Sequence, residues 1–373
     1  MSDLQNTTVE QTTDSDSQIS QILDTLTLEQ KVGQLFFIRP EQLAESYYLS
    51  ENSVNDTGDE GVTSVTDSMK EKYSDLPVGG FVLFARNIVS PNQVTEFTAE
   101  LCSLGTPNPI IAVDEEGGIV TRIASNELFD VPQIDSMGYI GQTEETENAR
   151  HAGSVIGEYL NKYGFQWDFA PVADLNTNPD NPVIGIRSFG SDPNMTADMA
   201  AAYIDGLHEN KVFSTLKHFP GHGDTSDDTH SGFVAVYKTW DELCETELVP
   251  FKNNLDKTDA VMTAHITLPE VSSDGLPASL SYEITTEKLR NEMGFDGVIV
   301  CDSLSMGAIT ENYSSSEAAV MAVKAGCDVL LTPQSIDEAY YGVLEAVKNG
   351  EISQERIDKS VERILLLKNS YNN

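Results

Sequence analysis

The sequence has little positive charge. Its 373 residues include 22 Lys and Arg against 60 Asp and Glu, which gives a formal net charge of −38 at pH 7. Such a field repels nucleic acid and anionic lipid surfaces, and no basic patch in the sequence offsets it. The composition therefore excludes nucleic acid as a partner, and a strongly anionic ligand needs a local cluster of cations.

Three further features are absent. No run of about 18 apolar residues occurs, so no segment is predicted to span a membrane. No Gly-x-Gly-x-x-Gly follows a predicted strand, which argues against dinucleotide binding. No Cys-x-x-Cys spacing suggests a metal or redox site, and buried thiols are the simpler interpretation of the four scattered cysteines. These are Cys102, Cys244, Cys301 and Cys327.

The N-terminal residues 1–18 lack large apolar side chains. They are rich in Ser, Thr, Asp and Gln, and we interpret them as a disordered polar tail. They also lack the basic start and the apolar run of a signal peptide. As written, the sequence therefore predicts a cytoplasmic protein, but a secreted or cell-surface protein whose signal had been removed would give the same pattern.

Short apolar, β-branched segments recur along the chain, and helical patterns lie between them. The segments span 34–39, 80–86, 109–116, 165–174, 213–219, 259–268, 296–304 and 328–333. Continuous apolar runs of this length are typical of parallel strands that are buried on both faces. An eightfold alternation of strand and helix predicts an α/β fold, namely a single (β/α)8 barrel of the TIM type over residues 19–373. Irregularity is expected in its first strands.

Helix signals fill the spaces between these strands. Ser90 and Pro91 form an N-cap and first-turn pair, and Thr27 with Gln30 resembles a capping box. The predicted helices span 90–104, 143–163, 195–209, 240–255, 313–325, 336–349 and 353–369. The long acidic segment 41–78 is interpreted as an insertion at the surface of the barrel.

Polar residues stand where several predicted strands end. In barrels of this type the functional residues lie at the carboxyl ends of the strands. Any one of these residues could be an ion pair or a cap, but five such strand ends on one rim indicate a site. The residues concerned are Asp114-Glu115-Glu116, Asp174, Lys217-His218, His265 and Asp302.

Asp302 directly follows the apolar run Val-Ile-Val-Cys. A carboxylate at the top of a buried strand is held rigidly, which suits a nucleophile. An N-cap for the following turn is the alternative interpretation.

The segment 217–230, Lys-His-Phe-Pro-Gly-His-Gly-Asp-Thr-Ser-Asp-Asp-Thr-His, holds three of the six histidines. Asp228 and His230 are two residues apart, so the carboxylate can orient the imidazole and make it an acid/base group. A solvated acidic loop is the alternative. Adjacent side chains of a strand point to opposite sides, so Lys217 and His218 reach one site only if the strand twists or bulges.

Three cations stand out against the acidic background. Lys217, Arg122 and Arg187 are candidates for recognising hydroxyl or carboxylate groups of a ligand. A surface ion pair is the alternative for each arginine.

Six segments of the chain together match the motif pattern of one enzyme family. They are Leu83-Phe-Ala-Arg86-Asn87, Val113-Asp114-Glu-Glu-Gly-Gly with Arg122, Phe169-Ala-Pro-Val-Ala-Asp174, Arg187-Ser-Phe-Gly190, Lys217-His218-Phe-Pro-Gly-His-Gly-Asp-Thr with Asp228-x-His230, and Cys301-Asp302-Ser-Leu-Ser-Met306. In order and spacing these segments resemble the β-N-acetylglucosaminidases of glycoside hydrolase family 3. The lysine–histidine motif is the most specific of them, and the resemblance covers roughly residues 20–370.

The resemblance implies a retaining β-N-acetylhexosaminidase that releases terminal β-linked GlcNAc. Its implied substrates are peptidoglycan fragments, GlcNAc–MurNAc or GlcNAc–anhydroMurNAc. Asp302 would form a glycosyl-enzyme, while His230, oriented by Asp228, would protonate the leaving oxygen and then activate water. The sugar would be held by Asp114, Arg122, Arg187, Lys217 and His218. No metal and no organic cofactor are implied, and a monomer is expected.

Two departures from the family pattern bear on this assignment. Ile186 stands where the family commonly has Asp before the arginine, so the support of Arg187 is expected to differ. The residues after His230 are Ser-Gly-Phe-Val where an aromatic residue followed by Gly-Leu-Pro is usual, so contacts to the leaving group are expected to differ.

Other functions are open on the sequence. A phosphorylase would use phosphate in place of water at the same site. A metal-dependent hydrolase would use His218, His222, Asp224 and His230, although Pro220, Gly221 and Gly223 break the helix that His-x-x-x-His needs. A Schiff-base aldolase would need Lys217 in an apolar pocket. A barrel that binds sugar without turnover is the non-enzymatic alternative.

Overall fold

The fold is taken from a computed structural model, which describes residues 18–44, 61–178, 180–225 and 233–370. The predicted disordered tail falls almost entirely outside these residues, and so do Asp228 and His230. No helix within the described ranges combines the length and the apolar character needed to cross a bilayer.

Eight parallel strands form the central sheet. They are β1 (Phe36–Ile38), β2 (Gly80–Val82), β3 (Ile110–Val113), β4 (Trp167–Asp168), β5 (Thr215–Phe219), β7 (Ala260–Thr263), β9 (Val298–Cys301) and β10 (Val329–Leu331). Their spatial order is β4-β3-β2-β1-β10-β9-β7-β5. Each predicted apolar segment contains one of them, so the eight predicted strand positions are confirmed.

The sheet closes between its two outer strands. Isolated parallel bridges join Trp167 to Phe213 and Val172 to Lys217, next to β4 and β5. The predicted (β/α)8 barrel is therefore confirmed. The irregularity was expected in the wrong place, because β1 and β2 pair without a shift. It lies instead at the short β4 and in β5, whose register against β7 shifts between Lys217 and Phe219.

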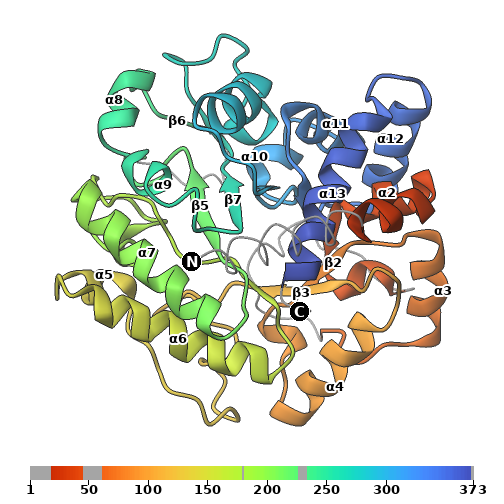
Figure 1. The fold of residues 1–373 in the computed structure, drawn as a ribbon, viewed down its shortest axis with the longest axis horizontal. Helices are drawn as coiled ribbons and strands as arrows, with labels where there is room; N and C mark the ends of the chain where they lie inside the picture. Colours follow the sequence, from red (N-terminus) through yellow and green to blue (C-terminus); the bar gives the residue numbers. More distant parts are fainter. Residues whose placement is uncertain (1–17, 45–60, 179, 226–232, 371–373) are drawn as a thin grey trace, which may run out of the picture.

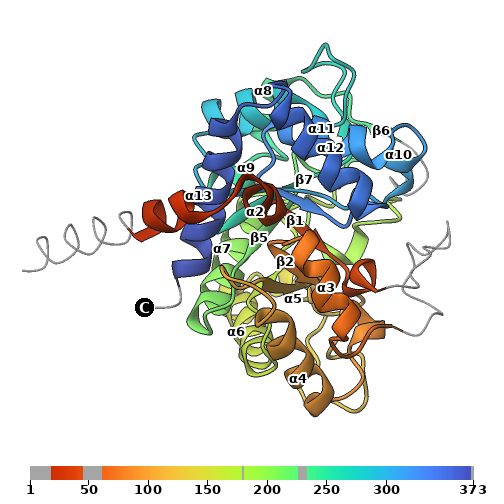
Figure 2. The ribbon, with the colours of Figure 1, turned by 90° about the vertical axis from the view of Figure 1, so that its right-hand side faces the viewer.

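Helices surround the strands (Figure 1). The main ones are α2 (Leu28–Gln34), α3 (Asp67–Asp75), α4 (Pro91–Cys102), α6 (Thr146–Lys162), α7 (Pro193–Glu209), α8 (Trp240–Glu245), α9 (Val249–Lys252), α11 (Ser315–Ala325), α12 (Ile336–Lys348) and α13 (Gln354–Ser370). The Thr27 capping box and the Ser90–Pro91 start are both present. Helix α2 packs against α12 and α13 from the other end of the chain (Figure 2).

Further elements lie between the main helices and strands of the described residues. They are α5 (Met137–Gly141), α10 (Gly307–Thr310), a π-helix at Glu283–Glu292, the 3-10 turns Pro40–Leu43, Ala85–Asn87, Gly185–Arg187 and Ala278–Leu280, and a two-stranded sheet of β6 (Val234–Ala235) and β8 (Ile266–Thr267). The predicted helix 240–255 is in fact two helices, because a second one begins at Val249, with Pro250 in its first turn. The π-helix was not predicted.

The segment 41–78 belongs to the barrel at both of its ends. Residues 40–43 are buried, and α3 buries Met69 and Tyr73 against the core. Helix α3 connects β1 to β2, so it is the first crossover helix of the barrel. The predicted surface insertion is therefore too broad, and its central part, residues 45–60, lies outside the described residues.

Aromatic and branched side chains fill the barrel. Trp167 is fully buried and meets Phe37 edge-on, with ring centroids 5.4 Å apart, and also contacts Phe169 and Phe213. A buried polar ring atom needs a partner, and the Trp167 indole N–H donates to the Thr215 hydroxyl at 2.7 Å. These side chains fill the interior of the barrel. A site can therefore form only beyond them, at the carboxyl ends of the strands.

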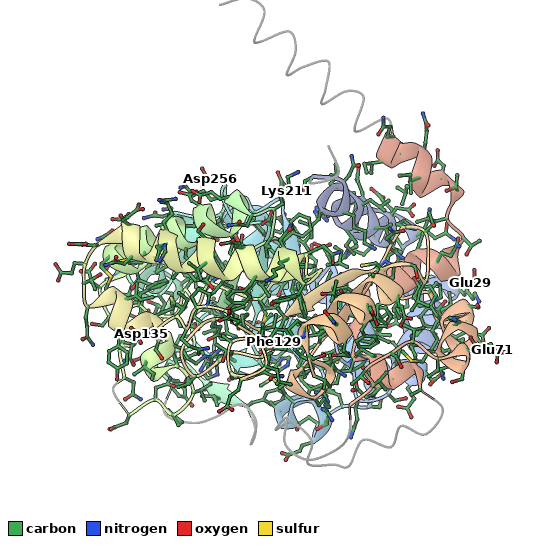
Figure 3. The ribbon with its side chains drawn as sticks, turned by 90° about the horizontal axis from the view of Figure 1, so that it is seen from below. Glu29, Glu71, Phe129, Asp135, Lys211 and Asp256 are labelled. Atoms are coloured by element: carbon green, nitrogen blue, oxygen red, sulfur yellow. The ribbon has the colours of Figure 1, made fainter. Side chains whose placement is uncertain are left out.

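The two ends of the barrel are well separated. In Figure 3, Lys211 and Asp256, which precede β5 and β7, lie at one end of the molecule. Asp135, in the loop after β3, lies lower in the same view, away from both of them.

Candidate active site

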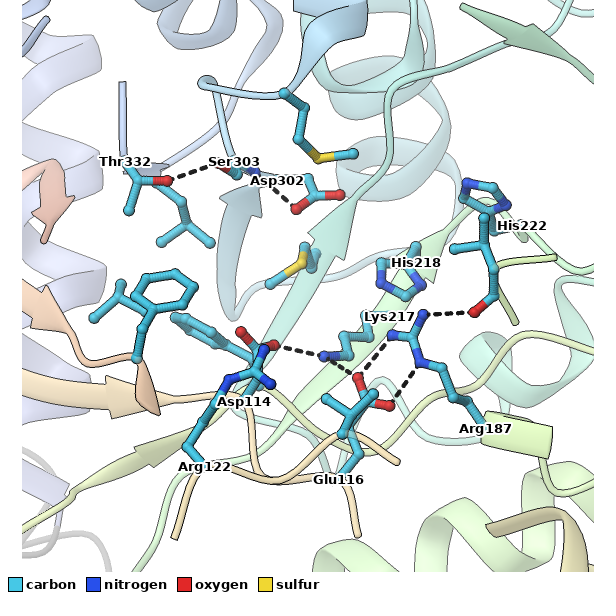
Figure 4. Close-up of a pocket in the computed structure, with 18 of the residues that line it drawn as sticks. Asp114, Glu116, Arg122, Arg187, Lys217, His218, His222, Asp302, Ser303 and Thr332 are labelled. Atoms are coloured by element: carbon cyan, nitrogen blue, oxygen red, sulfur yellow. Dashed lines mark hydrogen bonds and ion pairs between the residues drawn. The ribbon is translucent and has the colours of Figure 1, made fainter. Parts of the chain in front are cut away.

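A cavity of about 240 Å³ opens at the carboxyl ends of the strands. Six residues predicted from the sequence line it, and Figure 4 shows them around one space. They are Asp114, Arg122, Arg187, Lys217, His218 and Asp302. Asp228 and His230 lie outside the described residues, so their placement stays a prediction.

Lys217 and His218 both face the cavity although they are adjacent in sequence. The register shift of β5 against β7 occurs at these residues, so the strict alternation of a regular strand does not apply. The irregular strand end expected from the sequence is therefore present.

The Lys217 ammonium group is held by two carboxylates. Its Nζ atom lies 2.8 Å from Asp114 Oδ1 and 2.6 Å from Glu116 Oε1. Burial alone would lower the pKa of Lys217, but the two negative charges outweigh it and raise that pKa. Lys217 is therefore a fixed cation with hydrogen atoms to donate, and it is poorly suited to act as an amine nucleophile.

Glu116 connects Lys217 to Arg187. Arg187 Nη2 and Nε donate to Glu116 Oε1 and Oε2 at 2.7 and 2.8 Å. Burial would raise the pKa of Glu116, but the Arg187 and Lys217 charges hold that pKa far below its usual value. Two-point pairing of this kind fixes the guanidinium plane, so Glu116 sets the orientation of Arg187.

Glu116 was predicted only as one of the strand-end residues and was given no role of its own, although strand periodicity contained the signal. Residues two apart share a face, so Asp114 and Glu116 point into the cavity together. Glu115 points the other way and accepts hydrogen bonds from Tyr159 and from the backbone of residues 122–124. Ile186 is exposed, and Arg187 is supported by Glu116, so a change in its support relative to the family stays a prediction.

His218 is oriented by the buried carboxylate of Asp174. Asp174 Oδ2 lies 2.7 Å from His218 Nδ1 and also accepts the His218 backbone N–H, while Oδ1 accepts the backbone N–H of His222. Burial would raise the pKa of Asp174, but the neighbouring histidines and these donors lower it. Asp174 therefore organises the turn at His218–His222 from behind the cavity.

His222 also lines the cavity, and its ring Nδ1 lies 2.9 Å from the Thr225 hydroxyl. Burial and the nearby His218 lower the pKa of His222. This environment fits a structural role for His222.

Asp302 follows β9 and faces the cavity. Its Oδ1 atom accepts the backbone N–H of Ser303 at 2.7 Å. Burial would raise the pKa of Asp302, but His265, His218 and the Ser303 amide lower it. Asp302 is thus an ionised carboxylate, as a nucleophile requires.

His265 supports the Asp302 region from outside the cavity. It lies between β7 and β8, and its Nε2 atom is 2.9 Å from the Ser303 carbonyl oxygen. Its Nδ1 atom is 2.7 Å from the Ser279 hydroxyl. The rim position predicted for His265 is correct, but the residue does not line the cavity with the others.

Arg39 and Phe84 complete one wall and were not predicted. The Arg39 guanidinium carbon lies 4.9 Å from the centroid of the Phe84 ring, and that of Arg122 lies 6.0 Å from it. Arg39 follows β1 and is nearly buried, so its position resembles that of the predicted strand-end residues. It was overlooked because the predicted segment 34–39 was judged only by its apolar residues.

The described residues contain no cluster of three His, Cys, Asp or Glu side chains arranged to hold a metal ion. His218 and His222 were two of the candidate metal ligands. The His218 ring is oriented by its hydrogen bond to Asp174, and the His222 ring by its hydrogen bond to Thr225.

The fold and the cavity define the class of protein: it is a (β/α)8-barrel protein with a charged cavity at the carboxyl ends of its strands. The family profile described as "Glycosyl hydrolase family 3 N terminal domain" matches residues 27–367. The chain belongs to glycosyl hydrolase family 3.

Three relatives illustrate this membership. "Beta-hexosaminidase A" of Pseudoalteromonas piscicida is 33% identical over 371 residues, covering 92% of this chain and 61% of the relative. "Beta-hexosaminidase" of Hydrogenovibrio crunogenus is 36% identical over 286 residues, covering 74% of this chain and 78% of the relative. The solved structure of a family 3 β-N-acetylglucosaminidase from Paenibacillus is 38% identical, with a TM-score of 0.82, covering 92% of this chain and 62% of that one. The chain thus spans about three fifths of two of these relatives.

Proposed function

We propose that the protein is a retaining β-N-acetylglucosaminidase that removes terminal, non-reducing β-linked GlcNAc. The observation that carries the proposal is the position of ionised Asp302 in one cavity with Lys217, His218 and Arg187. The names of the relatives, β-hexosaminidase and β-N-acetylglucosaminidase, support the same activity.

In the proposed first step, a carboxylate oxygen of Asp302 attacks the anomeric carbon. The bond to the leaving oxygen breaks as that oxygen receives a proton, and a glycosyl–aspartate ester remains. We assign the proton donor to His230, oriented by Asp228, on the sequence motif. In the second step the same imidazole takes a proton from water, which attacks the anomeric carbon and releases GlcNAc and the carboxylate.

Sugar hydroxyls are proposed to bind the charged groups on the opposite wall. Asp114 accepts hydrogen bonds, while Lys217 and Arg187 donate them from positions fixed by Glu116. The cavity of about 240 Å³ is smaller than the ~300–1,000 Å³ typical of sites for drug-sized ligands, which fits one sugar residue. His218 and Arg122 complete the proposed sugar-binding set.

Peptidoglycan fragments, GlcNAc–MurNAc or GlcNAc–anhydroMurNAc, are the proposed natural substrates. This part of the proposal rests on the family resemblance of the motifs. An imidazole acid/base adds no second negative charge beside Asp302, which suits a leaving group that carries a carboxylate.

The Schiff-base alternative is disfavoured by the raised pKa of Lys217, because imine formation needs a neutral amine. A phosphorylase would share the first step with the proposed hydrolase, so the two differ only in what attacks the ester.

The test is hydrolysis of p-nitrophenyl β-N-acetylglucosaminide by the wild type and by Asp302→Ala and His230→Ala. We expect release of β-GlcNAc with retention, and a loss of at least about a hundredfold in each variant. If neither variant lost activity, the assignment would fail. Formation of GlcNAc-1-phosphate when phosphate is added would instead identify the phosphorylase.

A further inference from the structure

Thr332 has an unusual backbone conformation on the wall of the cavity. It follows β10, and its φ angle is +38°, in the left-handed region that a β-branched residue rarely adopts. Pro333 comes next, which further restricts the residue before it. Strained residues of this kind persist only where their surroundings hold them, and they cluster at functional sites.

Two contacts join this residue and its neighbour to the turn that follows Asp302. The hydroxyl groups of Thr332 and Ser303 lie 2.7 Å apart, and the Leu304 backbone N–H donates to the Leu331 carbonyl oxygen at 2.9 Å. Figure 4 shows Thr332, Ser303 and Asp302 connected in sequence by hydrogen bonds. The end of β10 and the turn after β9 are therefore one connected unit.

Ser303 is fixed through each of its polar groups. Its hydroxyl lies within hydrogen-bond distance of Thr332 and of Ser305, its carbonyl oxygen is 2.9 Å from His265 Nε2, and its amide donates to Asp302 Oδ1. The fixed Ser303 amide holds Asp302 Oδ1 in place by its hydrogen bond. The other carboxylate oxygen, Oδ2, is then the one available to attack the anomeric carbon in the proposed reaction.

We infer that Thr332 is a positioning residue for Asp302. Its hydroxyl anchors Ser303, and the Ser303 amide then holds the Asp302 carboxylate in the orientation for attack. This inference rests on the proposed function, because it assigns the nucleophile to Asp302. It adds a role for a residue that follows a different strand, β10, and does not itself react.

Two near-isosteric variants separate positioning from packing. Thr332→Val keeps the volume and the β-branch but removes the hydroxyl, whereas Thr332→Ser keeps the hydroxyl and removes a methyl group. If the Thr332 hydroxyl positions Asp302, the Thr332→Ser variant keeps the rate of attack by Asp302 and the Thr332→Val variant does not. If Thr332 only packs against its neighbours, the order is reversed.

Thr98→Val is the matched control. Thr98 is a similarly buried threonine whose hydroxyl donates to the Tyr163 carbonyl oxygen at 2.9 Å, in helix α4 and away from the cavity. Its substitution removes a buried hydroxyl without touching the Asp302 turn.

The experiment measures inactivation by a 5-fluoro-N-acetylglucosaminyl fluoride, whose capture requires attack by Asp302. The maximal inactivation rate constant and the inactivator concentration at half-maximal rate are compared for the four proteins. We expect Thr332→Val to lower the rate constant at least about tenfold with little change in that concentration, because a misdirected nucleophile slows attack more than binding. Thr332→Ser and Thr98→Val should stay within about threefold of the wild type.

Each outcome decides between the claims. A wild type that neither hydrolyses the nitrophenyl substrate nor reacts with the fluoride overturns the proposed function, and this inference with it. An active wild type with an unchanged Thr332→Val overturns the inference alone, as does a Thr332→Ser variant slower than Thr332→Val. Thermal unfolding of all four proteins is followed in parallel, and a slower Thr332→Val that loses no more stability than the active Thr98→Val supports positioning.

Discussion

Glu116 and Arg187 form a two-point ion pair in which Nη2–Oε1 and Nε–Oε2 are 2.7 and 2.8 Å apart. The same carboxylate also meets Lys217. The buried Glu116 carboxylate therefore compensates two cations on the wall of the candidate active site. Asp114 forms a second ion pair with one of them, Lys217.

Glu116→Gln is expected to destabilise the protein and weaken substrate binding. The substitution leaves two buried cations without their shared counter-charge, a loss that typically costs ~3–5 kcal/mol. The KM for the nitrophenyl substrate should rise, because Arg187 loses its orientation. Urea unfolding at pH 7 and steady-state kinetics measure both effects. Glu147→Gln removes an exposed ion pair with Arg150 and should change neither quantity.

The effect of Glu116→Gln should depend on pH. The pKa of folded Glu116 is lowered, so its stabilising contribution is fully present above the unfolded pKa of ~4.3 and is lost as the pH falls through the folded value. The difference in free energy of unfolding between wild type and variant should therefore shrink between pH 5 and the acid limit of folding. A difference that stayed constant would show that the charge is not the cause.

His265→Gln is expected to move the acid limb of kcat/KM to higher pH. Burial raises the pKa of Asp302 and His265 is the strongest influence that lowers it, so removing the imidazole should let that pKa rise. Less of the carboxylate is then ionised at a given low pH. A pH profile of kcat/KM measures this, because it reports groups of the free enzyme.

Glutamine can keep the hydrogen bond to the Ser303 carbonyl oxygen, which isolates the effect of charge. His208→Gln, near Asp259 at the other end of the barrel, is the control and should leave the acid limb in place. An unshifted limb in His265→Gln would contradict the assignment of Asp302 as the titrating nucleophile.

Asp174→Asn is expected to raise KM by more than about tenfold. Asp174 accepts three hydrogen bonds, two from His218 at one oxygen and one from the His222 backbone at the other. Asparagine has only one acceptor oxygen, so the bonds to the other position are lost and an NH2 donor faces the same groups. His218 should then lose its fixed orientation toward the sugar. Asp192→Asn is the control, since asparagine serves as well as aspartate at an exposed N-cap.

The strand positions could be predicted from the sequence because buried parallel strands leave continuous apolar runs. The strand-end residues could be predicted for the same reason, since Asp302 and Lys217 interrupt or end such runs. The barrel was predicted, but the irregular pairing that closes it between β4 and β5 was not, because β4 covers only two residues and depends on bridges to distant positions. Local pattern carries no information about such long-range pairing.

The roles of two residues, Glu116 and Thr332, were not predicted, and each omission has a physical reason. To recognise Glu116, the periodicity of β3 had to be extended to the three residues beyond the strand. The role of Thr332 depends on a positive φ angle and on a contact to Ser303, neither of which a threonine in a sequence reveals. The break before α9 was visible in the sequence, since Pro250 would disfavour the interior of one continuous helix.

The central claim is that Asp302 attacks the anomeric carbon. The most direct test is to treat the protein with the 5-fluoro-N-acetylglucosaminyl fluoride, digest it, and locate the added sugar by mass spectrometry. We expect one fluoro-N-acetylglucosaminyl group on the peptide that contains Asp302, with fragment ions placing it on that carboxylate, and none on Asp302→Ala. A sugar attached to another residue, or rapid inactivation of Asp302→Ala, would contradict the account.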